Sequence, residues 1–386
     1  MNKKLIISLV LGTLVSAITL YLAFRNIPFS ELIAYLGTIN YLWMVPATVV
    51  ILSSFVLRAV RWQIILRPAR RVRFWEAHNP MMIGFMMNCV LPGRVGELAR
   101  PILLRKQSKV PFTTGLATVA AERVFDLMLL ISLFAFVLAT VPIDPGLNMT
   151  FGKYQLNRDT LEMIAAGMLR ISILLIVGII LVTIDYTRSV IQKMILRIPS
   201  LLSFGSRSVE QTIRDRLAVP LVGIADNIAS GFSLVRYPKS IALIGLLTLI
   251  IWLLLAVSYS IMALGCPGVD LSYLELTAVM VVVSFFIALP SVPGFWGLWE
   301  AGGVFAMTLF GVSGKEAAGF TLANHALQML PVILVGLIAA IVTGVNILQV
   351  TKDDNLRDSE EQGTLPKPVT PGKQGELKGA KLKAQS

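Results

Sequence analysis

The chain has 386 residues, of which 55% are hydrophobic and only 15% are charged, whereas about 25% are charged in a typical soluble protein. So few charges cannot cover a water-soluble fold, and that class is excluded. The net charge is nevertheless +12. Few charges that are mostly basic are typical of a polytopic membrane protein with basic loops beside an anionic leaflet. Nucleic-acid binding is not expected, because the basic residues alternate with apolar segments instead of forming one domain.

A membrane-spanning helix needs about 20 residues. The first part of the chain contains three apolar segments that we predict to span the membrane: Leu5–Phe24, Tyr41–Leu57 and Thr113–Val141. Lys3 and Lys4 precede the first span, a pattern that signal peptides share, but its length and the lack of a clear cleavage site favour an uncleaved anchor. The sequence therefore predicts an N-terminus in the cytoplasm.

An arginine-rich segment follows the second predicted span and indicates a cytoplasmic loop. Its arginines are Arg58, Arg61, Arg67, Arg70, Arg71 and Arg73. Arg58, Arg61 and Trp62 are interpreted as anchors at the membrane interface, because Arg and Trp side chains commonly hold helix ends there.

The next apolar run, Met81–Leu91, has eleven uncharged residues and would extend only about 17 Å as a helix, roughly half the bilayer. It ends at the sequence Leu91-Pro-Gly-Arg-Val-Gly-Glu97, and basic residues flank it on both sides. Both flanks are therefore expected in the cytoplasm. We predict a re-entrant hairpin here, a helix that enters the membrane and returns.

The second part of the chain contains three further predicted spans, Met163–Ile184, Ile241–Gly265 and one within Ala317–Thr351. Residues 185–240 are rich in Lys and Arg and are predicted to form a cytoplasmic loop with an amphipathic helix, either at the membrane interface or packed on the inner surface of the bundle. The segment Leu276–Trp299 is uncharged but is interrupted by Pro and Gly. This segment is either a second re-entrant hairpin or a spanning helix.

The two interrupted segments resemble each other. The two motifs are Pro92-Gly-x-x-Gly96-Glu97 and Pro293-Gly-x-x-Gly297. Glu122 lies 30 positions after Pro92, and Asn324 lies 31 positions after Pro293. Polar residues then occupy equivalent positions: Glu122, Arg123 and Asp126 in one helix, Asn324, His325 and Gln328 in the other. Paired Pro/Gly-interrupted segments in two halves of opposite orientation are typical of transporters with a site near the midplane.

The predicted fold class is therefore an all-α polytopic membrane protein, with about six transmembrane helices and two re-entrant broken-helix hairpins in an inverted repeat. A bundle of six to eight helices with incidental kinks is the alternative. The predicted domain organisation is a transmembrane unit over 1–351, with repeats 5–141 and 163–350, and a disordered cytoplasmic tail over 352–386. The protein is predicted to span the inner (cytoplasmic) membrane of the cell several times, with both termini in the cytoplasm.

Charged residues inside membrane segments are costly and usually face a bundle interior or a wet cavity. Because Arg side chains bind phosphate well, we predict lipid-headgroup binding by Arg94, Arg100, Arg123, Asn324 and His325. Gating or the handling of a cation or proton is predicted for Glu97, Glu122, Asp126, Glu300 and Gln328. Hinge positions are predicted at Pro92, Gly93, Gly96, Pro293, Gly294 and Gly297.

One other interpretation of the charged residues remains open at this point. The charged residues could pair with one another for structural reasons, for example Glu122 with an arginine of the first hairpin. No Cys/His cluster occurs in the sequence, because Cys89, Cys266, His78 and His325 lie far apart. Neither a metal nor a cofactor is therefore predicted, and no residue is assigned a catalytic role.

Four motifs occur in order, Arg58-Ala-Val-Arg-Trp62, Leu91-Pro-Gly-Arg-Val-Gly-Glu-Leu-Ala-Arg100, Ala121-Glu-Arg-Val-Phe-Asp126 and Pro290-Ser-Val-Pro-Gly-Phe-Trp-Gly-Leu-Trp-Glu300. Together they resemble the lysylphosphatidylglycerol synthase transmembrane, or flippase-like, family over roughly residues 5–350. One departure is Phe295, where the family commonly has a second small residue after Pro-Gly. Only a polar segment follows residue 351, so aminoacyl transfer is not expected.

The resemblance implies a lipid translocase for an anionic, aminoacylated, polyprenyl or hopanoid-type lipid. A membrane enzyme acting on a lipid phosphate, or a non-catalytic partner in a lipid-synthesis complex, is the alternative. The expected partners are a membrane phospholipid or isoprenoid lipid and a lipid-biosynthesis enzyme, and a homo-oligomer is left open. The lipid itself, the direction of transport and the energy source do not follow from the sequence.

Overall fold

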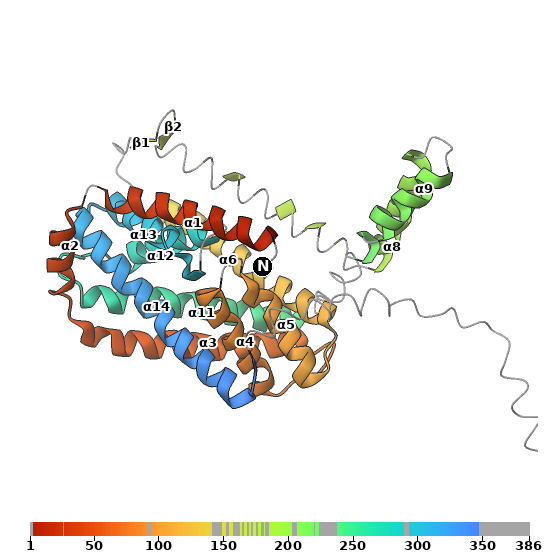
Figure 1. Cartoon of the computed structure of the whole chain (residues 1–386), viewed down its shortest axis with the longest axis horizontal. Coiled ribbons are helices and arrows are strands. Elements are labelled where there is room, and N and C mark those ends of the chain that lie inside the picture. The colour runs from red at the N-terminus through yellow and green to blue at the C-terminus, as the bar shows by residue number, and fades with distance from the viewer. Residues whose placement is uncertain are drawn as a thin grey trace, which may run out of the picture. The chain divides into compact units, whose positions relative to one another are not determined.

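The computed structural model describes residues 3–25, 27–91, 94–140, 149–151, 154–156, 185–202, 207–219, 221–223, 238–288 and 293–346, with isolated positions between 163 and 181 (Figure 1). The predicted span at 163–184, the tail 352–386 and the hinge residues Pro92 and Gly93 lie outside the described residues, apart from those isolated positions. The chain divides into a unit at Met1–Val345 and a unit at Asn346–Ser386.

The described residues form helices and one short hairpin of antiparallel strands, in which Thr150 faces Gln155. The elements of the N-terminal part are α1 (Lys3–Phe24), α2 (Phe29–Leu36), η1 (Tyr41–Trp43), α3 (Met44–Leu66), α4 (Phe74–Val90), α5 (Val95–Ser108), α6 (Phe112–Thr140), β1 (Met149–Phe151) and β2 (Tyr154–Leu156). Those that follow are α8 (Asp185–Leu202), α9 (Arg207–Ile213), η2 (Arg214–Ala218), α11 (Pro238–Leu264), α12 (Tyr273–Ala288), η4 (Pro293–Phe295), α13 (Leu298–Leu309) and α14 (Gly314–Thr343).

Four of the described helices are long and apolar enough to cross a membrane: Tyr41–Leu66, Phe112–Thr140, Pro238–Leu264 and Gly314–Thr343. Each lies at a predicted span, and α1 covers the first predicted span. The chain is therefore an all-α polytopic membrane protein, as the hydropathy of the sequence predicts.

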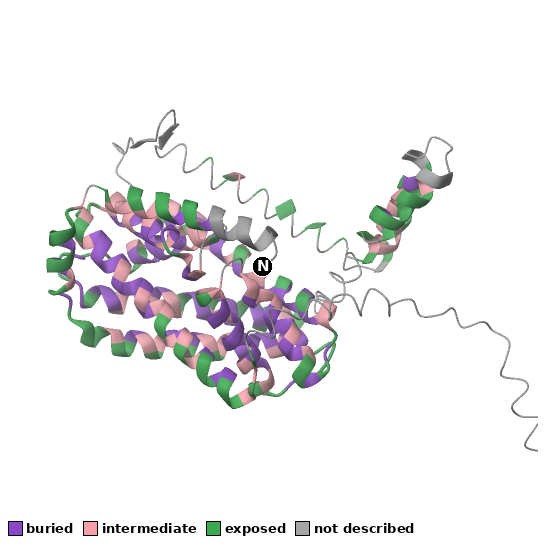
Figure 2. Ribbon diagram, in the orientation of Figure 1, coloured by how far each residue is buried: buried purple, intermediate pink, exposed green. Residues whose placement is uncertain are grey.

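The helices of the two predicted repeats pack against each other across the bundle. Helix α3 contacts α11, α4 contacts α14, and α12 contacts α6; Figure 1 shows α14 running across α4. Buried residues follow the inner faces of these helices, whereas exposed residues lie on their outer faces (Figure 2). The largest core cluster includes Trp252, Tyr259 and Phe320, so one core joins both halves of the sequence.

The first broken helix consists of α4, the turn that contains Arg94, and α5. Its first leg begins at Phe74, seven residues before the predicted start at Met81, and this corrects the predicted length. The extension forms because the Glu76 side chain accepts a hydrogen bond from the Arg73 N–H at 2.7 Å and caps the helix. With 17 residues, α4 nearly matches the 16 residues of α12, the first leg of the second broken helix.

Gly96, a predicted hinge residue, allows the backbones of the two legs to lie close together. A Cβ atom at Gly96 would lie 1.8 Å from the Gly84 carbonyl oxygen. The Gly96 N–H donates to the Asn88 side chain at 2.8 Å, which satisfies one of the free amides at the start of α5. Any larger residue at Gly96 would therefore separate α4 from α5.

The second broken helix consists of α12, the turn that contains η4, and α13. Its backbone adopts positive φ at Gly294 (69°), Phe295 (61°) and Gly297 (89°). Glycine adopts such angles freely, whereas a residue with a Cβ atom is strained there. The Glu300 side chain accepts a hydrogen bond from the Gly297 N–H at 2.7 Å and caps α13.

Candidate functional site

The turns of the two broken helices meet inside the bundle. A nitrogen of the Arg94 guanidinium donates to the Ile287 carbonyl at the end of α12. The same guanidinium lies 5.7 Å from the centre of the Phe295 ring. Arg94 and Phe295 occupy equivalent positions in the two Pro-Gly motifs, and both have positive φ, 54° and 61°. Two segments about 200 positions apart in the sequence thus contact each other through equivalent residues.

A cavity of about 320 Å³ lies beside this contact. Residues of α3, α4, α6, α11, α12 and α14 line it together with both turns, and most of the lining is apolar. Its charged lining residues are Arg58, Arg94, Glu97, Arg123 and Asp126. The cavity is thus amphipathic, with an ionic wall and apolar surroundings.

A network of buried ion pairs lies behind the ionic wall. Arg61 binds both oxygens of Asp126, at 2.6 and 3.1 Å, and its guanidinium lies 3.7 Å from Glu122. Arg100 binds Glu122 at 2.5 Å and lies 4.3 Å from the Trp62 ring. Because buried charges are tolerated only when they are paired and hydrogen-bonded, this network ties α3, α5 and α6 together.

The ionic wall itself is more open than the network behind it. Arg123 lies 3.5 Å from Glu97 and 3.7 Å from Asp126, and Arg58 lies 3.8 Å from Asp126. The Arg123 and Glu97 side chains are 38% and 27% exposed, so both can exchange their present partner for a ligand.

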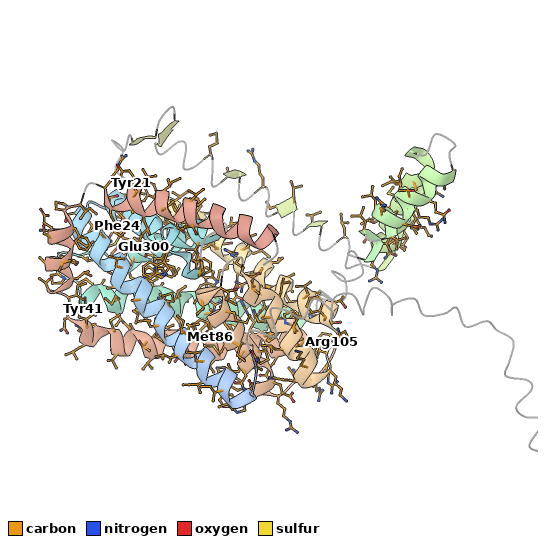
Figure 3. All side chains as sticks on the ribbon, viewed as in Figure 1. Tyr21, Phe24, Tyr41, Met86, Arg105 and Glu300 are labelled. Atoms are coloured by element: carbon orange, nitrogen blue, oxygen red, sulfur yellow. The ribbon has the colours of Figure 1, made fainter. Side chains whose placement is uncertain are left out.

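His325 and Glu300 form the polar centre of the second turn. The His325 Nε2–H donates to the Gly294 carbonyl at 2.7 Å, and Nδ1 lies 2.6 Å from a Glu300 carboxylate oxygen. Nε2 must carry a hydrogen because a carbonyl only accepts, so the contact at Nδ1 contains one shared proton and the pair has no net charge. Trp299 stacks on the imidazole with a centroid distance of 4.6 Å. Figure 3 labels Glu300 between the helices, where its exposed fraction is 0%.

The structure divides the residues predicted to bind the headgroup or to act in gating, together with Gly294, into two groups. Those on the cavity wall are Arg94, Glu97, Arg123, Asp126, Gly294, His325 and Gln328. Those buried away from the wall are Arg100, Glu122, Glu300 and Asn324. The pairing of Glu122 with an arginine of the first broken helix, which the sequence left open, is present in Arg100.

Residues at equivalent sequence positions of α6 and α14 lie at equivalent locations around the cavity. Arg123 and His325 both line the cavity, whereas Glu122 and Asn324 are both buried behind it. Asp126 and Gln328 also line it, and each contacts α11: Asp126 accepts from the Trp252 indole at 3.4 Å, and Gln328 donates to Ser258 at 3.0 Å.

Sequence reasoning missed the roles of Arg58 and Arg61. The prediction that Arg61 and Trp62 are interfacial anchors is wrong, because their exposed fractions are 1% and 0%. The available signal was spacing: Arg58 and Arg61 lie one helical turn apart, so both can face the carboxylates of α6.

The chain is thus a polytopic membrane protein with an ionic cavity between two broken helices. Residues 9–336 match the family described as the lysylphosphatidylglycerol synthase TM region, and the chain belongs to this family. The chain is also 26% identical over 381 residues to the glycosyltransferase AglD of Haloferax volcanii. That match covers 92% of this chain but 58% of the relative. No solved structure matches the chain.

Proposed function

We propose that the chain moves a lipid between the two leaflets of a cell inner membrane. The observation that carries this proposal is the meeting of both broken helices at one cavity with an ionic wall and apolar surroundings. A headgroup would occupy the ionic part while its acyl or isoprenoid chains remain in the membrane. Arg94, Arg123 and His325 are the headgroup contacts in this proposal, and Glu97, Asp126 and Gln328 change partners during opening.

The reciprocal packing of the two halves supports an inverted repeat. The first leg of each broken helix contacts the last helix of the other half, α4 with α14 and α12 with α6. In our proposal both broken helices are re-entrant from opposite faces, and both termini are cytoplasmic. Single cysteines at the exposed Gln107 and at Ser291, in a chain without Cys89 and Cys266, should react with an impermeant maleimide from opposite faces. Reaction from the same face would overturn the inverted arrangement.

Transport is tested with purified protein in liposomes that carry a fluorescent lipid in both leaflets. A membrane-impermeant reductant quenches half of the signal when no lipid moves, and more when the protein moves lipid. We expect Glu97→Gln to slow this movement at least tenfold, because Glu97 is one of the two carboxylates that pair with Arg123. Arg70→Gln is the matched control at an exposed position off the cavity. Protein that moves no anionic or aminoacylated lipid faster than empty liposomes contradicts the proposal.

A membrane enzyme acting on a lipid phosphate is the second candidate function. It is favoured by the name of the relative, a glycosyltransferase, of which this chain spans 58%. Formation of a new lipid product by the purified chain alone would support it, and the absence of product together with lipid movement would favour translocation. A role as a non-catalytic partner in lipid synthesis predicts that cellular function survives both Glu97→Gln and Arg94→Ala at normal protein level.

A further inference from the structure

The side chains around the cavity carry more positive than negative charge. Five arginines lie on the wall or in the network behind it: Arg58, Arg61, Arg94, Arg100 and Arg123. They face three carboxylates: Glu97, Glu122 and Asp126. The His325–Glu300 pair adds no net charge, so the described residues leave an excess of two positive charges. An excess of charge in a low-dielectric interior is costly unless a counter-ion offsets it.

The excess charge is located on the cavity wall. Arg94 contacts a carbonyl and an aromatic ring, and no carboxylate among the described residues lies within ion-pair distance of it. Among the described residues, Arg58 forms an ion pair with Asp126 at 3.8 Å, and that carboxylate already binds Arg61. By contrast, Arg61 and Arg100 behind the wall have carboxylates at 2.6 and 2.5 Å.

Aromatic rings hold the arginines of the wall in place without neutralising them. Arg58 lies 5.8 Å from the Phe55 ring centre and Arg123 lies 5.9 Å from that of Phe85. The two rings are themselves in edge contact at 5.1 Å. Cation–π contacts stabilise a guanidinium but leave its charge and its N–H donors available.

Buried donors in the same lining lack acceptors. Arg58 Nε and Trp299 Nε1 are buried and have no hydrogen-bond partner among the described residues, and both side chains line the cavity. A buried donor without an acceptor is rare in proteins. A ligand rich in acceptors and without donors of its own would suit these groups, and a phosphate is such a ligand.

We propose that the cavity binds a phosphate group with two negative charges, such as the phosphomonoester end of a lipid. The proposal rests on the proposed function and names its substrate class. Arg58, Arg94 and Arg123 would contact the phosphate oxygens from α3, the first turn and α6. A phosphodiester headgroup has one negative charge and would leave one arginine uncompensated.

The size of the cavity agrees with a headgroup and not with a whole lipid. A volume of about 320 Å³ lies at the lower end of the range for small-molecule sites. Acyl chains that fill half of a hydrocarbon core about 30 Å thick cannot enter it. The chains must therefore remain outside while the phosphate is bound.

Binding of lipids that share the same short chains tests the proposal. Calorimetry on the purified full chain at pH 8, where a phosphomonoester is mostly dianionic, compares phosphatidic acid with phosphatidylglycerol. We expect phosphatidic acid to bind at least tenfold more tightly. Inorganic phosphate is the third ligand: weaker binding than phosphatidic acid assigns the site to a lipid headgroup, and equal binding assigns the same dianion site to free phosphate.

Variants of the wall arginines test whether these residues cause the preference for phosphatidic acid. Arg94→Gln should reduce phosphatidic acid binding about tenfold and bring the two lipids closer in affinity, whereas Arg94→Lys should keep most of the preference. Arg58→Gln is the second variant if Arg94→Gln fails to fold, and Arg70→Gln, at an exposed position, is the control. Equal binding of both lipids, or a preference that Arg94→Gln and Arg58→Gln leave unchanged, would overturn the proposal.

The outcome is separable from that of the translocation test. Tight binding of phosphatidic acid without lipid movement would contradict translocation and support the dianion site. Lipid movement without this preference would support translocation and overturn the dianion site.

Discussion

The two broken helices begin from similar sequences but are stabilised in different ways. The first depends on charge: Arg100 is bound to Glu122 at 2.5 Å, beside Arg61 and Asp126. The second depends on one neutral pair, His325 with Glu300, between aromatic rings. The difference teaches that a repeated Pro-Gly motif specifies where a helix breaks but not which interactions hold the break.

Asp126→Asn should have the largest effect, because it removes the charge that pairs with Arg61 inside the protein. Leaving one partner of a buried ion pair uncompensated costs about 3–5 kcal/mol. Thermal unfolding of the purified protein in detergent measures the loss. Glu97→Gln, at the more open end of the wall, is the control and should cost under about 1 kcal/mol. Equal losses for the two variants would contradict the distinction between wall and network.

Gly96→Ala should follow, because its Cβ atom would lie 1.8 Å from the Gly84 carbonyl oxygen. Overpacking of a close contact typically costs about 1–3 kcal/mol and sometimes more, and here it would separate α4 from α5. Gly245→Ala in α11 is the matched control, since nothing lies within 4 Å of its Cβ position. We expect this control to be neutral or slightly stabilising in the same unfolding assay.

Glu300 should tolerate an amide where Asp126 does not. A glutamine at position 300 can still accept from the Gly297 N–H and can donate to His325 Nδ1, so Glu300→Gln should cost under about 1 kcal/mol. Glu300→Ala should cost about 1–3 kcal/mol, because it leaves two buried groups without partners. The comparison of these two variants by thermal unfolding tests the shared-proton pair. A large loss for Glu300→Gln would show that the carboxylate charge itself is required.

The smallest effect is expected at Phe295, whose φ of 61° is strained for a residue with a side chain. Phe295→Gly relieves this strain, by about 1 kcal/mol, but loses the contact with Arg94, which is worth about 0.5–1 kcal/mol. The net change should be near zero. Phe295→Ala keeps the strain and loses the contact, so it should unfold at a lower temperature than Phe295→Gly. The opposite order would show that side-chain packing outweighs the backbone strain.

Several parts of the site could be predicted from the sequence because they depend on local pattern. The spacing of Glu122, Arg123 and Asp126 matched that of Asn324, His325 and Gln328, and Arg123 and His325 do share one cavity. The pairing of Glu122 with a hairpin arginine was also foreseen as an alternative. The start of α4 was not foreseen, because the uncharged apolar run begins only at Met81, whereas the capping side chain of Glu76 allows the helix to begin at Phe74.

That the chain is a helical membrane protein with helices broken at two Pro-Gly motifs follows from the sequence, because apolar runs and glycine control the backbone of their own segment. Which ionic residues face the cavity and which are buried behind it depends on the packing of the helices. Arg94 and Arg100 lie within one short segment, yet one lines the cavity and the other is buried against Trp62 and Glu122. The same holds for Arg61: the sequence predicts an interfacial anchor, whereas the structure buries it against Glu122 and Asp126 of α6. The physical reason is that the role of a charge inside a membrane depends on its nearest counter-charge, and that partner comes from another helix.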